Sequence, residues 1–111
     1  MTDCIFCKII AGEIPCKKCY EDDEILAFYD INPQAPVHFL VIPKKHIPNI
    51  MEADAELLGK LLFKAQELAV KEGCGPKGCR FVINCKEDGG QTVDHLHVHV
   101  LGKRRLGWPP G

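Results

Sequence analysis

Three histidines stand at every second position of one short segment: His95, His97 and His99 lie in the run 95–101, with apolar residues between them. Successive side chains of a β-strand point to opposite faces of the sheet. A strand over 94–101 therefore aligns the three imidazoles on one face at a spacing of about 6.6 Å. The apolar side chains that turn toward the core on the other face are Leu96, Val98 and Val100. Three imidazoles in register indicate a functional site rather than three unrelated structural histidines.

Two kinds of chemistry fit such a row. Imidazoles on one strand can ligate zinc, as His-x-His pairs do in catalytic zinc sites. A neutral imidazole can also attack phosphorus and form a phosphohistidine-type intermediate that water later resolves. The segment Asp88–Thr92 directly precedes the row, and its glycines let backbone N–H groups approach an anion while Thr92 supplies a hydroxyl. This neighbour favours a phosphate.

Composition narrows the class of protein. The chain has 111 residues, of which 46% are hydrophobic and 26% charged, which predicts one globular domain over residues 1–111. A formal net charge of −1 gives no field that would attract nucleic acid or an anionic membrane surface. The apolar runs are much shorter than the roughly 20 residues of a membrane span, and the first residues do not resemble a signal peptide. We expect a cytosolic protein.

Seven cysteines are an odd number for a disulfide framework, and thiols at C-x-x-C spacing in a reducing compartment are more often metal ligands or redox pairs. Two such pairs are present, and together they could form a four-cysteine metal site. We expect Cys19 to point from a strand as a small core residue, and the last three cysteines to be plain thiols without recognisable spacing. The pairs are Cys4 with Cys7 and Cys16 with Cys19; the plain thiols are Cys74, Cys79 and Cys85.

The pattern of apolar residues predicts an α+β fold: a five-stranded antiparallel sheet with one long and one short helix, the helices packed on one face. Asp54 is the expected N-cap of the long helix, and Gly73 its stop. The predicted helices cover 3–11 and 54–72. The predicted strands cover 19–21, 25–29, 37–42, 80–84 and 94–101, with loops at 30–36, 73–78 and 87–91.

The segment His95–Leu101 matches the pattern His-φ-His-φ-His-φ-φ, where φ is apolar, and the match continues outside it through 30–36, 38–46, 88–91 and 108–111. In these segments the chain resembles the histidine triad (HIT) family, in its nucleotide-binding (HINT) branch. The resemblance covers nearly the whole chain. It implies the five-stranded HIT-like fold named above and an enzyme that transfers or hydrolyses nucleotidyl groups.

Catalytic roles follow from the resemblance, residue by residue. It makes His97 the nucleophile that attacks the α-phosphate and forms a nucleotidyl-histidine. His99 contacts the phosphate and assists the leaving group. The carbonyl of His95 fixes the tautomer of His97, and His38 is a supporting polar residue.

Nucleotide contacts are implied in the same way. Asp30 matches the carboxylate that binds the ribose hydroxyls, and its alternative is to cap the turn before Asn32. Thr92 stands where the family often has serine, and its β-branch narrows the rotamers of the hydroxyl. The purine slot is formed by Ile5, Phe6, Ile9, Phe28, Ile31 and Leu40. The other nucleotide-binding positions are Asn84, Gly90 and Gln91, and Trp108 lies near the partner's active site.

A metal is implied only as a structural element. Some family members bind zinc through two cysteines and two histidines, and the matching positions are Cys4, Cys7, His46 and His95. Two thiolates and two imidazoles suit a closed tetrahedral zinc site. We expect no catalytic cofactor, because a histidine nucleophile needs none.

The resulting hypothesis is a homodimeric purine nucleoside phosphoramidate hydrolase, pairing across the main helix and a neighbouring strand. One alternative is a diadenosine polyphosphate hydrolase, against which the terminal Trp-Pro-Pro-Gly argues. The other is a zinc-stabilised nucleotide-binding or interaction module. We expect no nucleic-acid partner and no membrane contact.

Overall fold

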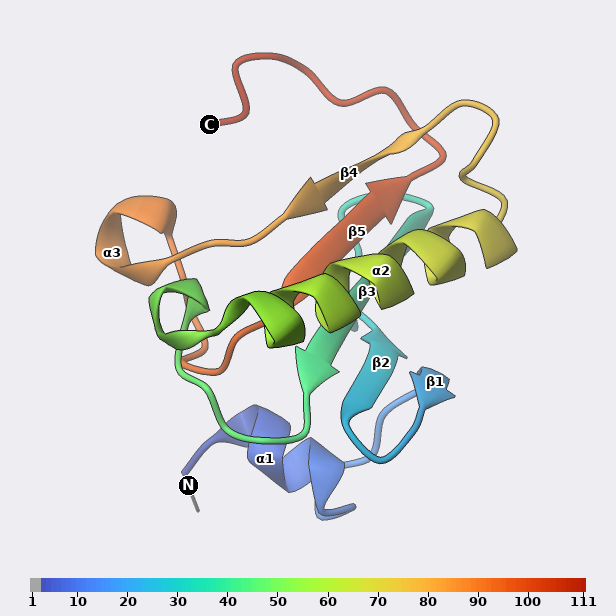
Figure 1. The fold of residues 1–111 in the computed structure, drawn as a ribbon. Coiled ribbons are helices and arrows are strands. Elements are labelled where there is room, and N and C mark those ends of the chain that lie inside the picture. The colour runs from blue at the N-terminus through green and yellow to red at the C-terminus, as the bar shows by residue number, and fades with distance from the viewer. Residues whose placement is uncertain (1–2) are drawn as a thin grey trace.

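A computed structural model describes residues 3–111 and contains one five-stranded antiparallel sheet (Figure 1). The strands lie in the order β1-β2-β3-β5-β4, so β3 and β5 occupy the middle beside each other. This architecture confirms the predicted α+β class. The strands are β1 (Lys18–Glu21), β2 (Ile25–Tyr29), β3 (Val37–Pro43), β4 (Cys79–Val82) and β5 (Val98–Gly102).

The long helix α2 (Ala55–Lys71) covers one face of the sheet. Its start is capped as expected, because Asp54 Oδ1 accepts a hydrogen bond of 2.9 Å from the backbone N–H of Leu57. The buried residues of the helix pack on alternate residues of the central strands, which form the main hydrophobic core. Its fully buried members include Leu61, Ala65, Phe39, Val41, Val98 and Val100.

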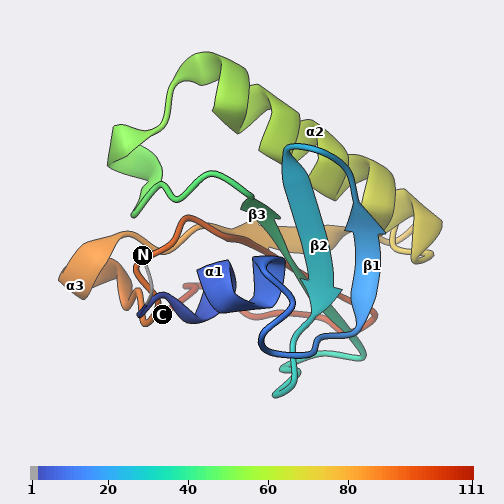
Figure 2. The ribbon, with the colours of Figure 1, turned by 90° about the horizontal axis from the view of Figure 1, so that it is seen from below.

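The short helix α1 (Ile5–Ile10) lies on the opposite face, below the sheet in Figure 2. Phe6 projects from it into a second apolar cluster with Leu26, Phe28, Leu40 and Ile42. The expectation that both helices pack on one face is therefore wrong. The cause is visible in β2 and β3, where nearly every residue is buried, because an unbroken apolar run marks a strand that is covered on both sides.

Some element boundaries also differ from the prediction. The strand expected over 94–101 begins only at Val98, so His95 lies in a bend and His97 in the irregular segment that leads into the strand. The loop expected over 87–91 contains the short helix α3 (Lys86–Gly89), which ends where Gly90 adopts a positive φ of 74°. A 3₁₀ turn, η1 (Ile50–Glu52), also lies outside the predicted elements. Between residues 3 and 111, no helix is long and apolar enough to cross a membrane.

Gly102, at the end of β5, sits in the tightest space of the sheet. A Cβ atom built on it would lie 2.5 Å from the Sγ of Cys74 and 3.3 Å from the Cβ of Cys79. Real Cβ atoms essentially never come within 3.0 Å of another heavy atom in this way. The end of α2, the start of β4 and the end of β5 therefore meet around a position that accepts only glycine.

We expect Gly102→Ala to lower the free energy of unfolding by about 1–3 kcal/mol, because the added methyl group overpacks a filled site. Gly59→Ala is the matched control, since Gly59 is exposed within α2 and nothing lies within 4 Å of its added Cβ. That change should instead stabilise the protein by roughly 1 kcal/mol through helix propensity. Urea denaturation of both variants measures the difference, and equal effects of the two changes would contradict the packing argument.

Candidate active site and metal cluster

Strands β3 and β5, with the segment that leads into β5, bring four histidines together on the face of the sheet that α1 covers. His38 lies on β3, His99 on β5, and His95 and His97 in the segment that leads into β5. The ring centres of His97 and His99 are 5.0 Å apart, and those of His38 and His99 are 5.2 Å apart. The histidines predicted from the sequence thus form one cluster, even though only His99 lies in a paired section of β5.

His97 is held in one tautomer by its own segment. Its Nδ1 lies 2.7 Å from the backbone carbonyl oxygen of His95. A carbonyl oxygen can only accept, so Nδ1 carries the proton and donates it, and Nε2 of the neutral ring keeps a lone pair. The ring is buried, and this burial lowers the pKa of His97. Both observations give His97 the properties of a neutral nitrogen nucleophile.

His38 and His99 form a second, complementary chain of hydrogen bonds. The backbone N–H of Gln34 donates to Nδ1 of His38 at 3.0 Å, so the proton of neutral His38 resides on Nε2. That Nε2 lies 3.0 Å from Nδ1 of His99, which therefore accepts. The proton of neutral His99 is consequently on Nε2. The two central histidines carry opposite tautomers: His97 offers a lone pair at Nε2, and His99 offers a proton there.

Burial keeps this cluster uncharged. It lowers the pKa of His99 to about 4, and the neighbouring rings of His97 and His38 act in the same direction. Burial also lowers the pKa of His38 and, in the adjoining cluster, that of His95. The carboxylate of Asp30 opposes the shifts of His38, His97 and His99. At neutral pH the site is therefore a set of uncharged imidazoles beside one carboxylate.

Asp30 caps the turn before Asn32 and also lies beside His38, while its role toward ribose hydroxyls stays a prediction. One oxygen, Oδ1, accepts from the backbone N–H of Asn32 at 2.8 Å, which is the turn-capping role. The other oxygen, Oδ2, lies 3.5 Å from Nε2 of His38. The side chain is 21% exposed, so this carboxylate is reachable at the edge of the histidine cluster.

Part of the predicted purine slot exists as a buried apolar wall. The ring of Phe6 meets Phe28 edge to face at 5.5 Å between centres and His97 at 5.1 Å, and Leu40 is buried beside them. Ile9 packs half-buried against this cluster. The two remaining members point away from it in the single chain: the exposed fraction is 97% for Ile31 and 46% for Ile5.

Three backbone N–H groups of the segment 88–92 are already engaged within the protein, so an anion site there depends on the rest of the segment. The N–H groups of Gly89, Gly90 and Gln91 donate to carbonyl oxygens of the short helix and its cap. The side chain of Gln91 is also engaged within the protein, donating to the carbonyls of Pro48 and Val93 and accepting from the N–H of Lys86. The segment closes as a helical turn, so Gln91 positions the chain before the histidines.

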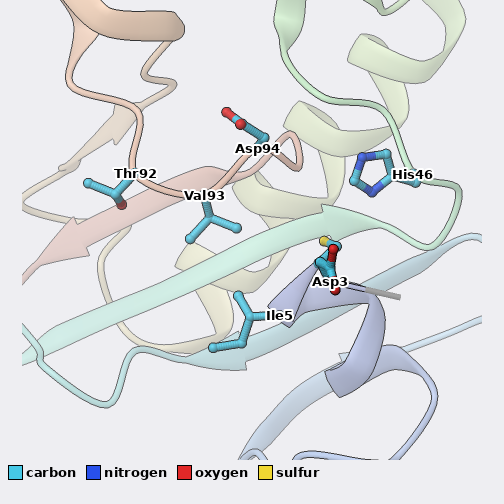
Figure 3. Close-up of a pocket in the computed structure, with 7 residues that line it drawn as sticks. Asp3, Ile5, His46, Thr92, Val93 and Asp94 are labelled. Atoms are coloured by element: carbon cyan, nitrogen blue, oxygen red, sulfur yellow. The ribbon is translucent and has the colours of Figure 1, made fainter. Parts of the chain in front are cut away.

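The remaining residues predicted to contact the nucleotide lie nearer the surface of the protein. Asn84 is half-buried and borders Gly89, whose added Cβ would lie 3.6 Å from the Cα of Asn84. Thr92 is exposed and borders a hollow of 390 Å³ between the start of α1 and the segment before β5, which Figure 3 shows. Trp108 is 83% exposed in the single chain, and its distance to a partner's site stays a prediction.

Next to the histidine cluster lies the predicted set of metal ligands. Its four ligand atoms all lie within 4.8 Å of one another: the Sγ atoms of Cys4 and Cys7 and the Nδ1 atoms of His46 and His95. Cys4 Sγ is 3.3 Å from His95 Nδ1, and Cys7 Sγ is 3.3 Å from His46 Nδ1 and 3.7 Å from His95 Nδ1. A tetrahedral zinc ion separates sulfur and nitrogen ligands by roughly 3.5 Å, so the cluster fits that ion.

The hydrogen bond of His95 Nε2 also supports a metal site at this cluster. Nε2 lies 2.8 Å from the carbonyl oxygen of Pro43, so it carries the proton and leaves Nδ1 free to accept a metal. Cys4 and His46 also border the hollow of Figure 3, which gives the cluster an entrance from solvent. The alternative four-cysteine site is wrong, because Cys16 packs on the α1 face and Cys19 on the α2 face.

Sequence reasoning missed the groups that hold the histidines through backbone atoms. The N–H of Gln34 and the carbonyl of Pro43 each fix one ring, and Arg104 Nε donates to the carbonyl of Gln34 at 2.8 Å. Residue type carries no signal for such contacts, because every residue but proline has the same backbone donor and acceptor. The only available hint was the position of Pro43, which closes β3.

We expect His99 to stay neutral in the unliganded protein down to about pH 4, because burial and two neighbouring imidazoles disfavour its cation. The unfolded chain binds this proton near pH 6.5, so His99 makes the folded state progressively less stable between 6.5 and about 4. NMR titration of the His99 ring protons measures the pKa directly. A midpoint near 6.5 in the folded protein would contradict the burial argument.

Comparison with known proteins agrees with this geometry. A family model described as the HIT domain matches residues 11–106. An uncharacterised HIT-like protein of Synechococcus elongatus is 57% identical over 98% of this chain and 97% of its own length. A similarly named protein of Synechocystis is 55% identical over the same shares.

Solved structures give the same result. A HIT family hydrolase from Legionella pneumophila superposes with a TM-score of 0.95 and 51% identity, covering 98% of this chain and 100% of that one. A histidine triad protein from Clostridium difficile gives 0.91 and 44%, with 96% of both chains covered. The row of alternating histidines, the sheet that carries it and these similarities lead to one conclusion: the chain belongs to the histidine triad (HIT) family.

Proposed function

We propose that this protein is a hydrolase of purine nucleoside phosphoramidates, of the HINT branch, which works through a covalent nucleotidyl group on His97. The observation that carries the proposal is the pair of opposite tautomers. The hydrogen bond from His97 Nδ1 to the carbonyl of His95 leaves a lone pair on His97 Nε2. The hydrogen bond from His38 Nε2 to His99 Nδ1 leaves the proton of His99 on its Nε2, which can donate it. A neutral nucleophile beside a proton donor is the minimum that cleavage of a phosphoramidate requires.

The first half of the reaction transfers the nucleotidyl group. As the anionic substrate binds, its negative charge stabilises the cation of His99. His99 takes up a proton at Nδ1 and no longer accepts from His38, whose Nε2–H then has Asp30 Oδ2, 3.5 Å away, as its acceptor. His97 Nε2 attacks the α-phosphorus, the bond between phosphorus and the leaving nitrogen breaks, and the departing amine takes the proton from His99 Nε2. Asp30 helps to hold the charged ring, because its carboxylate already favours protonation of His99.

The second half releases the product. Water attacks the same phosphorus, and the bond between phosphorus and His97 Nε2 breaks. His99 Nε2 accepts the proton of the water, so both histidines return to their earlier state. The products are a nucleoside monophosphate and a free amine. The chain supplies positioning and proton transfer, and the reaction requires no redox partner.

The apolar wall and Asp30 support a nucleoside as the bound group. Phe6 and Phe28 form an apolar wall next to His97 against which a base can lie, and the carboxylate of Asp30 can accept both protons of a ribose cis-diol. Hydrolase activity is also named for the solved relative from Legionella pneumophila.

We further propose that Cys4, Cys7, His46 and His95 hold a structural zinc ion. Two thiolates and two imidazoles would supply all four ligands of such an ion, so it would stabilise the fold and would not bind substrate. These ligands tie the start of α1 to the segment that carries the triad. Because Phe6 belongs to α1 and contacts His97, the cluster also fixes the wall of the base pocket.

A homodimer is the third part of the proposal, and exposed apolar residues support it. Leu62, Phe63 and Val70 on α2 and Phe81 on β4 are each more than 40% exposed. They occur on the two elements through which the resemblance pairs subunits. Large apolar side chains exposed on neighbouring elements are typical of an interface.

For catalysis, we expect His97→Ala to abolish both a covalent adenylate adduct and AMP release from an adenosine phosphoramidate, lowering the rate by a factor of about 10³ or more. Intact-mass spectrometry after rapid quenching detects the adduct, and chromatography measures AMP. Asp94→Asn, outside the proposed machinery, is the matched control and should keep activity. Full turnover by His97→Ala would refute the covalent route. Faster cleavage of diadenosine polyphosphate than of the phosphoramidate would refute the substrate class.

For the metal, we expect about one zinc ion per chain in protein purified without chelator. Cys7→Ser should lower this content and reduce the thermal midpoint, whereas Cys85→Ser, a half-buried cysteine outside the cluster, should change neither. Elemental analysis and thermal denaturation measure the two effects. Equal zinc content in the wild type and Cys7→Ser would contradict the proposed ligand set.

For assembly, we expect the mass from light scattering to be twice that of the 12.4 kDa chain. Phe63→Glu should shift the protein toward the monomer, because it places a charge in the proposed interface. Lys60→Glu is a control on the same helix with an already polar side chain. A monomeric wild type at micromolar concentration would refute the dimer.

A further inference from the structure

Two cysteines outside the proposed site lie together at the opposite end of the sheet from the triad. Cys74 is 2% exposed in the turn that follows α2, and Cys79 is the first residue of β4 and half-buried. Both pack against the core on the α2 face. In Figure 1 the connection between α2 and β4 lies beside the end of β5, where this pair meets.

Their distance is bounded by Gly102, which lies between them. One point, the position of a Cβ on Gly102, is 2.5 Å from Cys74 Sγ, 3.4 Å from Cys74 Cβ and 3.3 Å from Cys79 Cβ. The Cβ atoms of the two cysteines therefore flank the same small space and lie at most 6.7 Å apart. A disulfide requires Cβ atoms about 3.5–4.5 Å apart, so its formation needs a shift of the turn that brings the Cβ atoms together, along with a rotation of the side chains.

The turn between them is compact and bears few constraints from the rest of the fold. The N–H of Gly78 donates to the carbonyl of Cys74 at 2.8 Å, and Gly78 has a positive φ of 84°. The four intervening residues are exposed. The small shift that a disulfide needs is therefore confined to a surface turn and leaves the strands in place.

A basic hollow borders Cys74 and Gly78, the residue that precedes Cys79. Its volume is 700 Å³, and Cys74 is one of its lining residues. Four cationic side chains surround it and no acidic residue lines it: Lys77, Lys103, Arg104 and Arg105. A hollow of this charge concentrates small anions near the thiols.

We propose that Cys74 and Cys79 are a redox-active pair that closes into a reversible disulfide on reaction with a small anionic disulfide, such as glutathione disulfide, held in the basic hollow. Cys79, the more exposed thiol, loses its proton and attacks one sulfur of glutathione disulfide. This step forms a mixed disulfide and releases one glutathione, which takes up a proton. Cys74 then attacks the Cys79 sulfur and releases the second glutathione in the same way.

The overall change balances: two protein thiols are oxidised to one disulfide, and one glutathione disulfide is reduced to two glutathione molecules. Burial and the neighbouring Cys74 raise the pKa of Cys79, so little of it is thiolate at neutral pH. The positive charge of the hollow compensates for this low thiolate fraction, because it holds the anionic disulfide near the two thiols. The other described cysteines lack this combination. Cys4 and Cys7 face histidines, Cys16 and Cys19 lie on opposite faces of the sheet, and Cys85 stands at the start of α3.

The test is peptide mapping of the whole protein. The zinc-loaded protein is incubated with glutathione disulfide, alkylated with N-ethylmaleimide and digested with trypsin. Cleavage after Lys71, Lys77 and Arg80 places the two cysteines in separate peptides, 72–77 and 78–80. We expect a linked pair of these peptides, lighter by about 2 Da than the two free peptides together, which disappears on reduction with dithiothreitol.

Matched variants distinguish a specific disulfide between Cys74 and Cys79 from nonspecific oxidation of the cysteines. Cys79→Ser should abolish the linked peptide and leave Cys74 reduced, because Cys74 is buried, whereas Cys85→Ser should leave the link intact. A persistent glutathione adduct on Cys79, or a link to Cys85 instead, would overturn the pairing. A Cys74 that stays reduced in the fully oxidised wild type would do the same.

The role of the hollow is tested with the rate of linking. We expect Lys103→Glu together with Arg105→Glu to slow the reaction with glutathione disulfide at least tenfold and to leave the reaction with neutral 2-hydroxyethyl disulfide unchanged. High salt should reduce the first rate and not the second. Equal slowing with both reagents would show that the charges act on the fold, and would overturn an anion-guided step.

Discussion

The hydrogen bonds of His95 are the constraint on which both proposed sites depend. Its backbone carbonyl accepts from Nδ1 of His97, its Nε2 donates to the carbonyl of Pro43, and its Nδ1 faces the sulfur atoms of Cys4 and Cys7. One fully buried residue thus sets the tautomer of the candidate nucleophile and completes the candidate zinc site. Any change that moves this ring affects both, so the two sites are one structural unit.

A row of buried polar rings is costly unless every nitrogen has a partner, and here the partners are other imidazoles and backbone atoms. Within residues 3–111, no buried side-chain nitrogen or oxygen lacks a hydrogen-bond partner. The pairing works only while the rings are neutral, since a cationic ring could not accept from its neighbour. Burial therefore does more than lower the pKa of these histidines: it also selects the one arrangement of protons that satisfies all of them.

The sequence predicted those features that depend on periodicity and residue type. Alternation placed His95, His97 and His99 on one side and Leu96, Val98 and Val100 in the core, and the structure confirms both. It predicted five strands and the capped helix α2. It did not predict that α1 lies on the opposite face, although the unbroken apolar run in β2 carried that signal. The closed helical turn at 86–89 was also missed, because paired glycines are equally common in open loops.

Features set by contacts between distant backbone atoms could not be predicted in this way. The donor of His38 is the N–H of Gln34, and nothing in the type of residue 34 identifies it. The proximity of Cys74 and Cys79 could not be predicted from residue type either. Their spacing along the chain is not diagnostic, and only the absence of a side chain at Gly102 brings them into one space.

The contact between Cys4 and His95 joins residues that are 91 positions apart, so it spans most of the chain. A contact of this separation closes a long loop, and the entropy cost of that closure is met by the packing of the segments between its ends. During synthesis the two thiols are made before His46, and His95 is the last of the four residues to be made. The proposed ligation at this cluster therefore requires that the chain has been made through His95, and a shorter nascent chain carries thiols that are open to other reactions.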